Sequence, residues 1–254
     1  MLTIAQIKDI CQPKDFRLAD EKAEIELLAF DSRNVLIPQK TMFFAITTAK
    51  NDGHHYIPEL WKQGVRNFII TQPIASFSQF SDANFLQVTD AVTALQQIAA
   101  YHRQQFNYPV VGITGSNGKT IVKEWLSQML APEFHVVKNP NSYNSQIGVP
   151  LSVWQMAQRH NLAIFEAGIS QPGEMERLAS IIRPTIGILT NIGAAHNEFF
   201  QNNEEKLIEK VKLFQHCQNG PGFIVALVLI KAVASAHGPA SSRISGFCTR
   251  DRRS

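Results

Sequence analysis

The residues with the clearest chemical potential lie in the segment GITGSNGKT, Gly112–Thr120. Gly115 and Gly118 let the backbone approach phosphate oxygens, and the Lys119 ammonium can reach the β- and γ-phosphates of a nucleotide. The Thr120 hydroxyl is a suitable Mg²⁺ ligand. We therefore predict a nucleotide phosphate site formed by Gly115, Ser116, Asn117, Gly118, Lys119 and Thr120.

The segments on either side of this loop are those that a phosphate site requires. Val110–Thr114 is predicted to be a buried strand, and Thr120–Leu130 an amphipathic helix whose dipole adds positive charge at the loop. The match to GxxxxGK[ST] is imperfect, because Ile113 stands where that pattern has its first Gly. An ordinary tight turn with an exposed lysine is therefore the alternative. We expect the apolar residues of the helix to form one stripe: Ile121, Val122, Trp125, Leu126, Met129 and Leu130.

The first 88 residues contain short apolar runs separated by turn-forming residues, which is typical of alternating strands and helices. We predict strands at Ile25–Phe30, Thr41–Ile46 and Phe68–Ile70, and helices at Ile4–Ile10 (capped by Thr3) and Tyr56–Gln63. This pattern predicts a small α/β domain over residues 1–88.

The alternation continues to about residue 214. Asp90 is placed to cap a helix, Leu162–Phe165 and Ile186–Leu189 are predicted strands, and Glu174–Ile182 is the helix between them. Strands that alternate with helices form parallel sheets with crossover helices. We therefore predict an α/β fold in which residues 89–214 form a P-loop ATPase-like domain with a mostly parallel sheet.

The character of the chain changes after residue 214. Residues 215–254 hold five of the 24 basic residues but one of the 21 acidic ones, so residues 1–214 carry a net charge of −1. A nucleic-acid-binding protein needs a clustered basic face, so we expect no nucleic-acid partner. The tail has one apolar run, Phe223–Ile230, and then a Ser-, Gly- and Arg-rich end. We expect residues 215–254 to be non-native or disordered and not to continue the alternating pattern.

Composition excludes several other classes of protein. The three cysteines form no CxxC pair, which argues against a zinc finger or a disulfide scaffold. No apolar run approaches the roughly 20 residues of a membrane span, and the N-terminus has no secretory pattern. We expect a cytoplasmic protein without membrane insertion.

Four further segments of the chain, in addition to the glycine-rich loop, are informative about its family. They are Asp31–Ile46 (DSRNVLIPQKTMFFAI), Asn141–Ser152 (NSYNSQIGVPLS), Ile164–Met175 (IFEAGISQPGEM) and Leu189–Phe200 (LTNIGAAHNEFF). Together with GITGSNGKT they resemble the Mur ligases over roughly residues 1–214. The resemblance implies an amide ligase that uses ATP and Mg²⁺. It further implies the type that phosphorylates the carboxylate of UDP-N-acetylmuramoyl-tripeptide to an acyl phosphate, which the amine of D-alanyl-D-alanine then attacks.

By the same resemblance, residues 1–88 bind the UDP-sugar and residues 89–214 are the first part of the central ATP-binding domain. We expect the central domain to be incomplete here and the chain alone to be inactive.

Four residues are candidates for catalysis: Lys119, Glu166, His196 and Lys210. Glu166 ends an apolar strand, at the edge of the sheet where ligands bind, and could hold Mg²⁺ together with Thr120; a solvated strand-end carboxylate is the alternative. The resemblance implies that His196 is also a metal ligand; an ordinary surface or core histidine is the alternative. Lys210 lies at the border of an apolar helix face, where burial disfavours its charge. The resemblance implies that its amine forms a metal-binding carbamate with CO₂, and a surface lysine is the alternative.

Substrate contacts are predicted at two places. Asn144 is a candidate for the substrate or the phosphates, with a turn-forming Asn as the alternative. Asp31, Ser32 and Arg33 are candidates for the UDP portion, with a salt-bridged turn as the alternative. The adjacent His54 and His55 are weaker candidates there.

Two other functions remain open. One is another ligase with the same loop, such as a different Mur ligase or a folylpolyglutamate synthetase-like enzyme; the UDP-sugar-like segment Asp31–Ile46 argues against the latter. The other is a non-catalytic chain that binds only the UDP-sugar.

Overall fold

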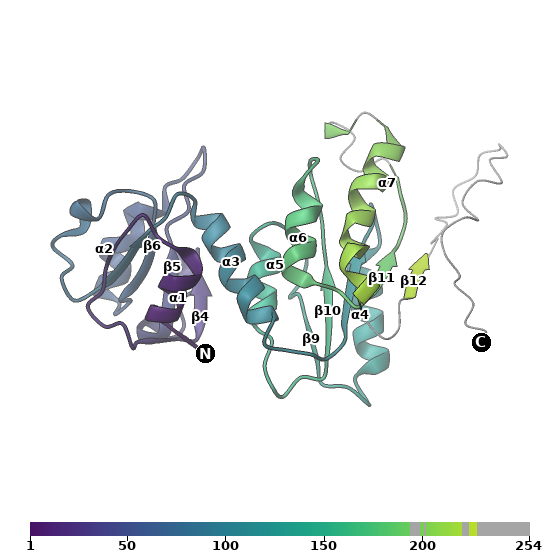
Figure 1. The fold of residues 1–254 in the computed structure, drawn as a ribbon, viewed down its shortest axis with the longest axis horizontal. Coiled ribbons are helices and arrows are strands. Elements are labelled where there is room, and N and C mark those ends of the chain that lie inside the picture. The colour runs from purple at the N-terminus through teal and green to yellow at the C-terminus, as the bar shows by residue number, and fades with distance from the viewer. Residues whose placement is uncertain (194–198, 201, 220–223, 228–254) are drawn as a thin grey trace.

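The computed structural model describes residues 1–193, 199–200, 202–219 and 224–227. Two five-stranded sheets, one in each half of the chain, dominate the fold, and helices cover them (Figure 1). The mixed α/β class with parallel sheets that the sequence predicts is confirmed. No helix within the described residues is long and apolar enough to cross a bilayer.

The N-terminal half contains the first of these sheets. Its strand order is β2-β7-β6-β5-β4, with β2 antiparallel and the other strands parallel. The strands are β2 (Asp15–Arg17), β4 (Leu27–Ala29), β5 (Thr41–Phe44), β6 (Asn67–Ile70) and β7 (Asn84–Gln87). The helices are α1 (Ile4–Cys11), α2 (Ile57–Lys62), and the short 3₁₀ segments η1 (Ser32–Asn34), η2 (Pro38–Lys40), η3 (Gly53–Tyr56) and η4 (Ile74–Phe77). Thr3 caps α1 as predicted, through a reciprocal capping box with Gln6.

The predicted strand Ile25–Phe30 is divided in two. β3 (Glu24–Ile25) pairs with β1 (Leu2–Thr3) in a separate antiparallel ribbon, whereas β4 joins the main sheet. Glu26 lies between the two strands, and its backbone carbonyl accepts a hydrogen bond from Trp154 Nε1 at 2.8 Å. The strand therefore ends where its backbone turns to contact the second half of the chain.

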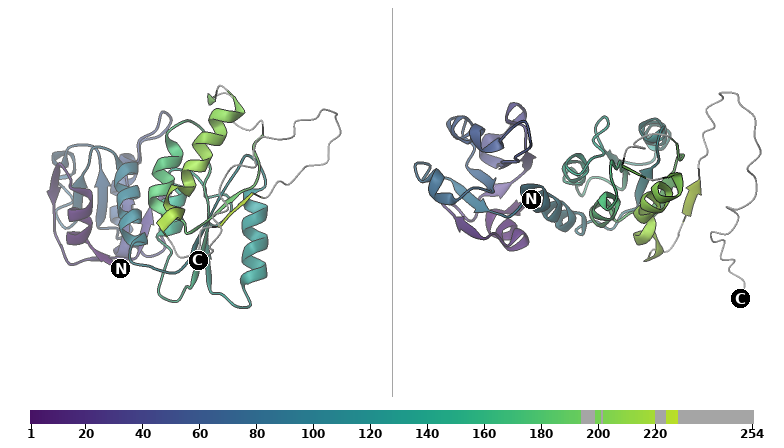
Figure 2. Two further views of the ribbon diagram at one scale, coloured as in Figure 1. Left: turned by 45° about the vertical axis from the view of Figure 1, so that its right-hand side comes forward. Right: turned by 90° about the horizontal axis from the view of Figure 1, so that it is seen from above.

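The second sheet is parallel throughout, in the order β12-β11-β8-β10-β9. Its strands are β8 (Val110–Thr114), β9 (Val136–Lys138), β10 (Leu162–Glu166), β11 (Ile186–Leu189) and β12 (Ile224–Leu227). Its helices are α4 (Lys119–Leu130), α5 (Gly148–Val153), α6 (Glu174–Ile182), α7 (Asn203–Val211) and the 3₁₀ segment η6 (Lys212–Asn219). Figure 2 shows α4 on one face of this sheet and α6 and α7 on the other.

Successive side chains of a strand point to opposite faces of the sheet, so each face of the second sheet has its own apolar core. Leu162 and Ile164 of β10 pack with Val122 of α4, whereas Ala163 and Phe165 pack with α5 and α6. The next residue after Phe165, Glu166, therefore points to the α4 face.

Helix α3 (Ala91–Arg103) connects the two halves. It contacts α1 on one side and α5 and α6 on the other. One core cluster joins apolar residues of the first sheet to α3 and to Trp154. The two halves are thus held together by a continuous apolar contact in addition to the covalent link.

Two expectations are corrected by the structure. The apolar residues of α4 do not form one buried stripe: Val122, Leu126 and Leu130 face the sheet, but Trp125 and Met129 are 61% and 76% exposed. Ile121 is exposed with them. Six apolar positions cover more of the helix circumference than one sheet face can contact.

The second correction concerns the tail. Residues Ile224–Leu227 form β12, which pairs in parallel with β11, so the alternating pattern does not end at residue 214. Cys217, in η6, is buried in the core of the second half. Residues 220–223 and 228–254 lie outside the described residues.

The cap of α3 provides a test of this architecture. The Asp90 carboxylate accepts hydrogen bonds from the backbone N–H groups of Val92 and Thr93, at 3.4 and 2.8 Å. We predict that Asp90→Ala lowers the free energy of unfolding by about 1 kcal/mol, because α3 loses its N-terminal acceptor. Urea denaturation measures this. Asp9→Ala, on the exposed end of α1, is the control, with an expected change below about 0.5 kcal/mol; equal losses would contradict the assignment.

Candidate active site

The loop between β8 and α4 has the backbone shape of an anion cradle. Gly115 and Gly118 adopt φ angles of +144° and +81°, which side chains with a Cβ rarely tolerate. Gly118 is the N-cap of α4, and no side chain caps this helix end. The first N–H groups of a helix have no intrahelical acceptor. Those of α4 therefore have no side-chain acceptor at the place where the sequence predicts a phosphate.

A second segment braces this loop from the neighbouring strand. Asn191, just after β11, accepts hydrogen bonds from the N–H groups of Ser116 and Asn117, at 2.9 and 2.8 Å. The Thr190 hydroxyl donates to the Asn117 carbonyl at 2.6 Å, and Gly193 N–H donates to Ser116 Oγ at 2.9 Å. Sequence reasoning missed this bracing role. The sequence feature that could have indicated this role is the polar pair Thr190-Asn191, which directly follows a buried strand.

Glu166 is the buried acid of the site. It is fully buried at the end of β10, and its register opposite Ile113 places it beside the loop. Thr120 Oγ1 donates to Glu166 Oε2 at 2.9 Å, and Asn144 Nδ2 donates to Glu166 Oε1 at 3.2 Å. Ser142 Oγ lies 3.5 Å from Thr120 Oγ1. The structure thus brings together three residues that the sequence places in separate motifs.

Two lysines converge on one carbonyl of the loop. Lys119 Nζ and Lys210 Nζ donate to the Gly115 carbonyl at 2.9 and 3.0 Å. Burial lowers the pKa of Lys119, and the nearby Glu166 opposes that shift. Burial, together with the positive charges of Lys119 and Lys206, lowers the pKa of Lys210 to about 8. Lys210 is 2% exposed, so the alternative of a surface lysine is excluded.

These residues fit a nucleotide with Mg²⁺. Mg²⁺ prefers oxygen ligands in octahedral geometry and takes several of them from water and phosphate. Thr120 Oγ1 and Glu166 Oε2 are such oxygens, they lie side by side, and the phosphate loop begins beside them. Within the described residues there is no group of three His, Cys, Asp or Glu side chains that could hold a metal alone.

Three of the remaining predicted residues lie in the first half of the chain. His196 falls outside the described residues. Asp31, Ser32 and Arg33 are at η1, after β4 of the first sheet, and Arg33 Nη2 donates to Asp31 Oδ2 at 2.7 Å. That pairing lowers the pKa of Asp31 to about 2.

The adjacent histidines of the first half differ from each other. His54 is buried, and its Nδ1 lies 2.5 Å from Asp52 Oδ1 while its Nε2 accepts the Thr71 N–H at 3.0 Å. Both ring nitrogens of His54 are therefore engaged in holding the fold. His55 is exposed.

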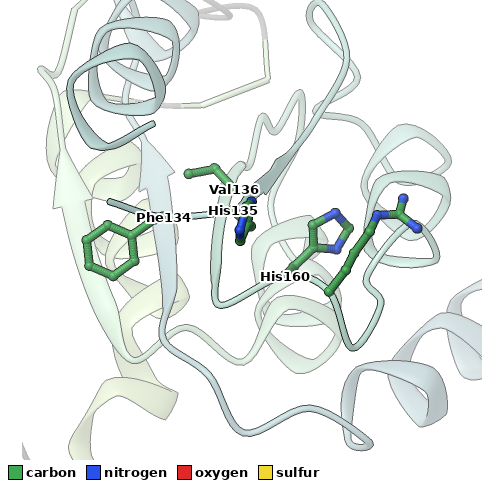
Figure 3. Close-up of a pocket in the computed structure, with 5 residues that line it drawn as sticks. Phe134, His135, Val136 and His160 are labelled. Atoms are coloured by element: carbon green, nitrogen blue, oxygen red, sulfur yellow. The ribbon is translucent and has the colours of Figure 1, made fainter. Parts of the chain in front are cut away.

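A pocket of about 430 Å³ lies away from this site. Phe134, His135, Val136, Arg159 and His160 line it (Figure 3). β9 begins at Val136 and β10 at Leu162, so the pocket is at the amino ends of the strands. Ligands of parallel sheets bind at the carboxyl ends, where the phosphate loop is.

Comparison with known proteins agrees with this geometry. The family model for the Mur ligase middle domain matches residues 113–243. The chain belongs to the Mur ligase family. The match extends past residue 214, where we expected the resemblance to end, so part of the tail shares the family pattern. This agrees with the parallel pairing of β12.

Two Mur ligases that carry curated names are similar in sequence. The UDP-N-acetylmuramoyl-tripeptide–D-alanyl-D-alanine ligase of Synechocystis is 35% identical over 69% of this chain and 38% of its own length. The enzyme of the same name from Treponema pallidum is 33% identical over 78% of this chain and 44% of its own. The chain thus spans less than half of the length of these relatives.

Two solved structures are similar in fold. MurF from Acinetobacter baumannii has a TM-score of 0.78 and 26% identity, covering 88% of this chain and 48% of its own. MurF ligase from Thermotoga maritima, solved in complex with ADP, has a TM-score of 0.69 and 28% identity, covering 79% and 45%. The Mur ligase fold of this chain is therefore that of the MurF structures.

Gly115 offers a test of the loop geometry. A Cβ at Gly115 would lie 1.9 Å from Thr190 Oγ1, whereas a Cβ at Gly173, also at positive φ, has nothing within 4 Å. We predict that Gly173→Ala costs about 1–3 kcal/mol of unfolding free energy from backbone strain alone. Gly115→Ala should cost more and displace Thr190 from the loop. Urea denaturation of both variants measures this, and equal losses would show that Thr190 does not constrain the loop.

Proposed function

We propose that this chain is the nucleotide- and UDP-sugar-binding part of an ATP-dependent ligase that joins D-alanyl-D-alanine to UDP-N-acetylmuramoyl-tripeptide. The observation that carries the proposal is the contact, at the start of α4, between Thr120 Oγ1 and the buried Glu166 carboxylate. That contact places Glu166 Oε2, an oxygen suited to bind Mg²⁺, beside the phosphate loop. The names of the relatives support the choice of substrates.

In this proposal the chemistry is acyl activation. The tripeptide carboxylate displaces ADP from the γ-phosphorus of ATP and forms an acyl phosphate. The amine of D-alanyl-D-alanine then attacks the acyl carbon, loses a proton and expels inorganic phosphate. A bound Mg²⁺ supplies charge neutralisation between the anionic reactants. Since ATP is the phosphoryl donor, the proposal places the reaction in the cytoplasm.

The chain's own residues have separate roles in this scheme. Lys119 and the first backbone N–H groups of α4 hold the β- and γ-phosphates, and Thr120 and Glu166 provide oxygens for Mg²⁺. Asn144 donates to the same Glu166 carboxylate and orients it. His196 remains a proposed metal ligand. The incomplete central domain and the inactivity of residues 1–254 alone stay predictions, and phosphate release that requires both substrates would contradict the latter.

The UDP portion is proposed to bind in the first half of the chain, at Asp31, Ser32 and Arg33. The Arg33 side chain is 86% exposed, so its guanidinium is accessible to a diphosphate even while it pairs with Asp31. Binding of UDP-N-acetylmuramoyl-tripeptide, but not of a folate, would separate this proposal from the folylpolyglutamate synthetase alternative. Binding of the UDP-sugar without any nucleotide binding would instead favour the non-catalytic alternative.

Lys119 provides the direct test of nucleotide binding. Hydrogen bonds to charged groups contribute about 1.5–3 kcal/mol, so Lys119→Met should weaken Mg·ADP binding by about ten- to a hundredfold. Isothermal titration calorimetry measures the affinity. Lys62→Met, at an exposed position of α2, is the matched control and should leave the affinity unchanged. Unchanged binding in Lys119→Met would reject the phosphate site.

Lys210 provides a test of the carbamate. Its pKa of about 8 lies below the ordinary value of 10.5. At pH 7 the amine is therefore mostly protonated, and at pH 9 it is mostly neutral and able to react. At a fixed concentration of ¹³C-bicarbonate we predict a carbamate signal in ¹³C NMR that rises through about pH 8 and is absent in Lys210→Met.

Lys212 is the matched control for this measurement. It lies two residues further along the chain, and its hydrogen bond to Glu209 raises its pKa, so it stays protonated. Lys212→Met should therefore retain the carbamate signal. A signal that persists in Lys210→Met would assign the reactive amine to another lysine.

A further inference from the structure

Lys123 is a fully buried lysine that the proposed chemistry does not use. It lies on α4 one turn after Lys119. Its Nζ donates to the backbone carbonyls of Asn139, at 2.9 Å, and of Asn141. It also lies 3.3 Å from Glu124 Oε1, although Glu124 itself is bound by Lys138. A buried ammonium is costly unless it is hydrogen-bonded, so this arrangement indicates a specific role.

The two carbonyls that Lys123 binds belong to the loop after β9. The Asn139 side chain is also fully buried, and its Oδ1 accepts the backbone N–H of Glu166 at 2.7 Å. Its Nδ2 donates to the Tyr143 carbonyl at 2.6 Å. Lys123 thus holds the residue that fixes the backbone of Glu166.

The same loop carries two groups into the candidate site. Ser142 Oγ lies 3.5 Å from Thr120 Oγ1, and Asn144 Nδ2 donates to Glu166 Oε1. Thr120 belongs to α4, as Lys123 does. The contacts therefore form a closed ring that runs from α4 through the loop to Glu166 and back to α4 at Thr120.

We propose that Lys123 is a positioning residue that sets the spacing of the Thr120 and Glu166 oxygens, and through it the affinity of the site for Mg²⁺. This inference rests on the proposed nucleotide function. The ammonium binds backbone carbonyls behind the site and contacts neither the phosphate loop nor the Glu166 carboxylate. Its removal should consequently affect metal binding more than nucleotide binding.

The test measures the two affinities separately in residues 1–254. Lys123→Met keeps the length of the side chain but removes its charge and donors. With EDTA present, we expect calorimetry to give an ADP affinity within about twofold of wild type. In saturating ADP, the affinity for Mg²⁺ should fall by about tenfold or more, as for other residues that orient metal ligands. Backbone hydrogen exchange of residues 139–148 should become faster.

Lys138→Met is the matched control. Lys138 lies next to Asn139 and pairs with the same Glu124, but the structure gives it no bond to the loop carbonyls. Its removal should leave the Mg²⁺ affinity within about twofold, as expected for a surface ion pair. An equal loss of Mg²⁺ affinity in Lys138→Met would show that the effect comes from the overall positive charge of this region, and it would overturn the proposal.

A second variant breaks the next contact in the ring. Asn139→Ala should reproduce the loss of Mg²⁺ affinity, and the double variant should lose no more than the larger single loss, because both act through one connection. If circular dichroism shows that Lys123→Met does not fold, the Mg²⁺ affinity of Asn139→Ala is the measurement that tests the proposal. Wild-type Mg²⁺ affinity in the folded variants would overturn the role of Lys123. Absence of ADP binding to the wild-type chain would instead reject the proposed function.

Discussion

The buried carboxylate of Glu166 is the constraint on which the rest of the second half depends. A carboxylate without solvent is unfavourable unless donors and positive charge surround it. Here the Thr120 hydroxyl and the Asn144 amide donate to its two oxygens, and the Lys119 charge lies nearby. The phosphate loop and the loop after β9, which carries Asn144, must therefore lie on either side of the end of β10. This requirement fixes the position of the site.

The parallel sheet satisfies the requirement through its register. β8 lies between β10 and β11, so the residues after Thr114, Glu166 and Leu189 emerge at one edge. Each strand is connected to the next by a helix that returns the chain to the opposite edge. Segments that are about 75 residues apart in sequence, such as Ser116 and Asn191, thereby come within hydrogen-bond distance.

The sequence predicted the parts of this site that depend on local pattern. The strand, glycine loop and helix of Val110–Leu130 are contiguous, and Glu166 is visible as a carboxylate at the end of an apolar run. The bracing by Thr190 and Asn191 and the burial of Lys123 were not predicted, because tertiary contacts alone give those residues their roles. Periodicity likewise identified the apolar residues of α4 but not which of them face the sheet.

The lysines of the site explain how it can accept an anion without first breaking an ion pair. Lys119 and Lys210 share the Gly115 carbonyl, and among the described residues neither forms a salt bridge. Burial is the main cause of the lowered pKa of Lys210, and the positive charge of Lys119 adds to it. In the proposed function, a phosphate at the loop would give the two ammonium groups an anionic partner in place of one neutral carbonyl. Conversion of Lys210 to the proposed carbamate would replace its positive charge with a negative one, so the charge beside the phosphates depends on the state of that amine.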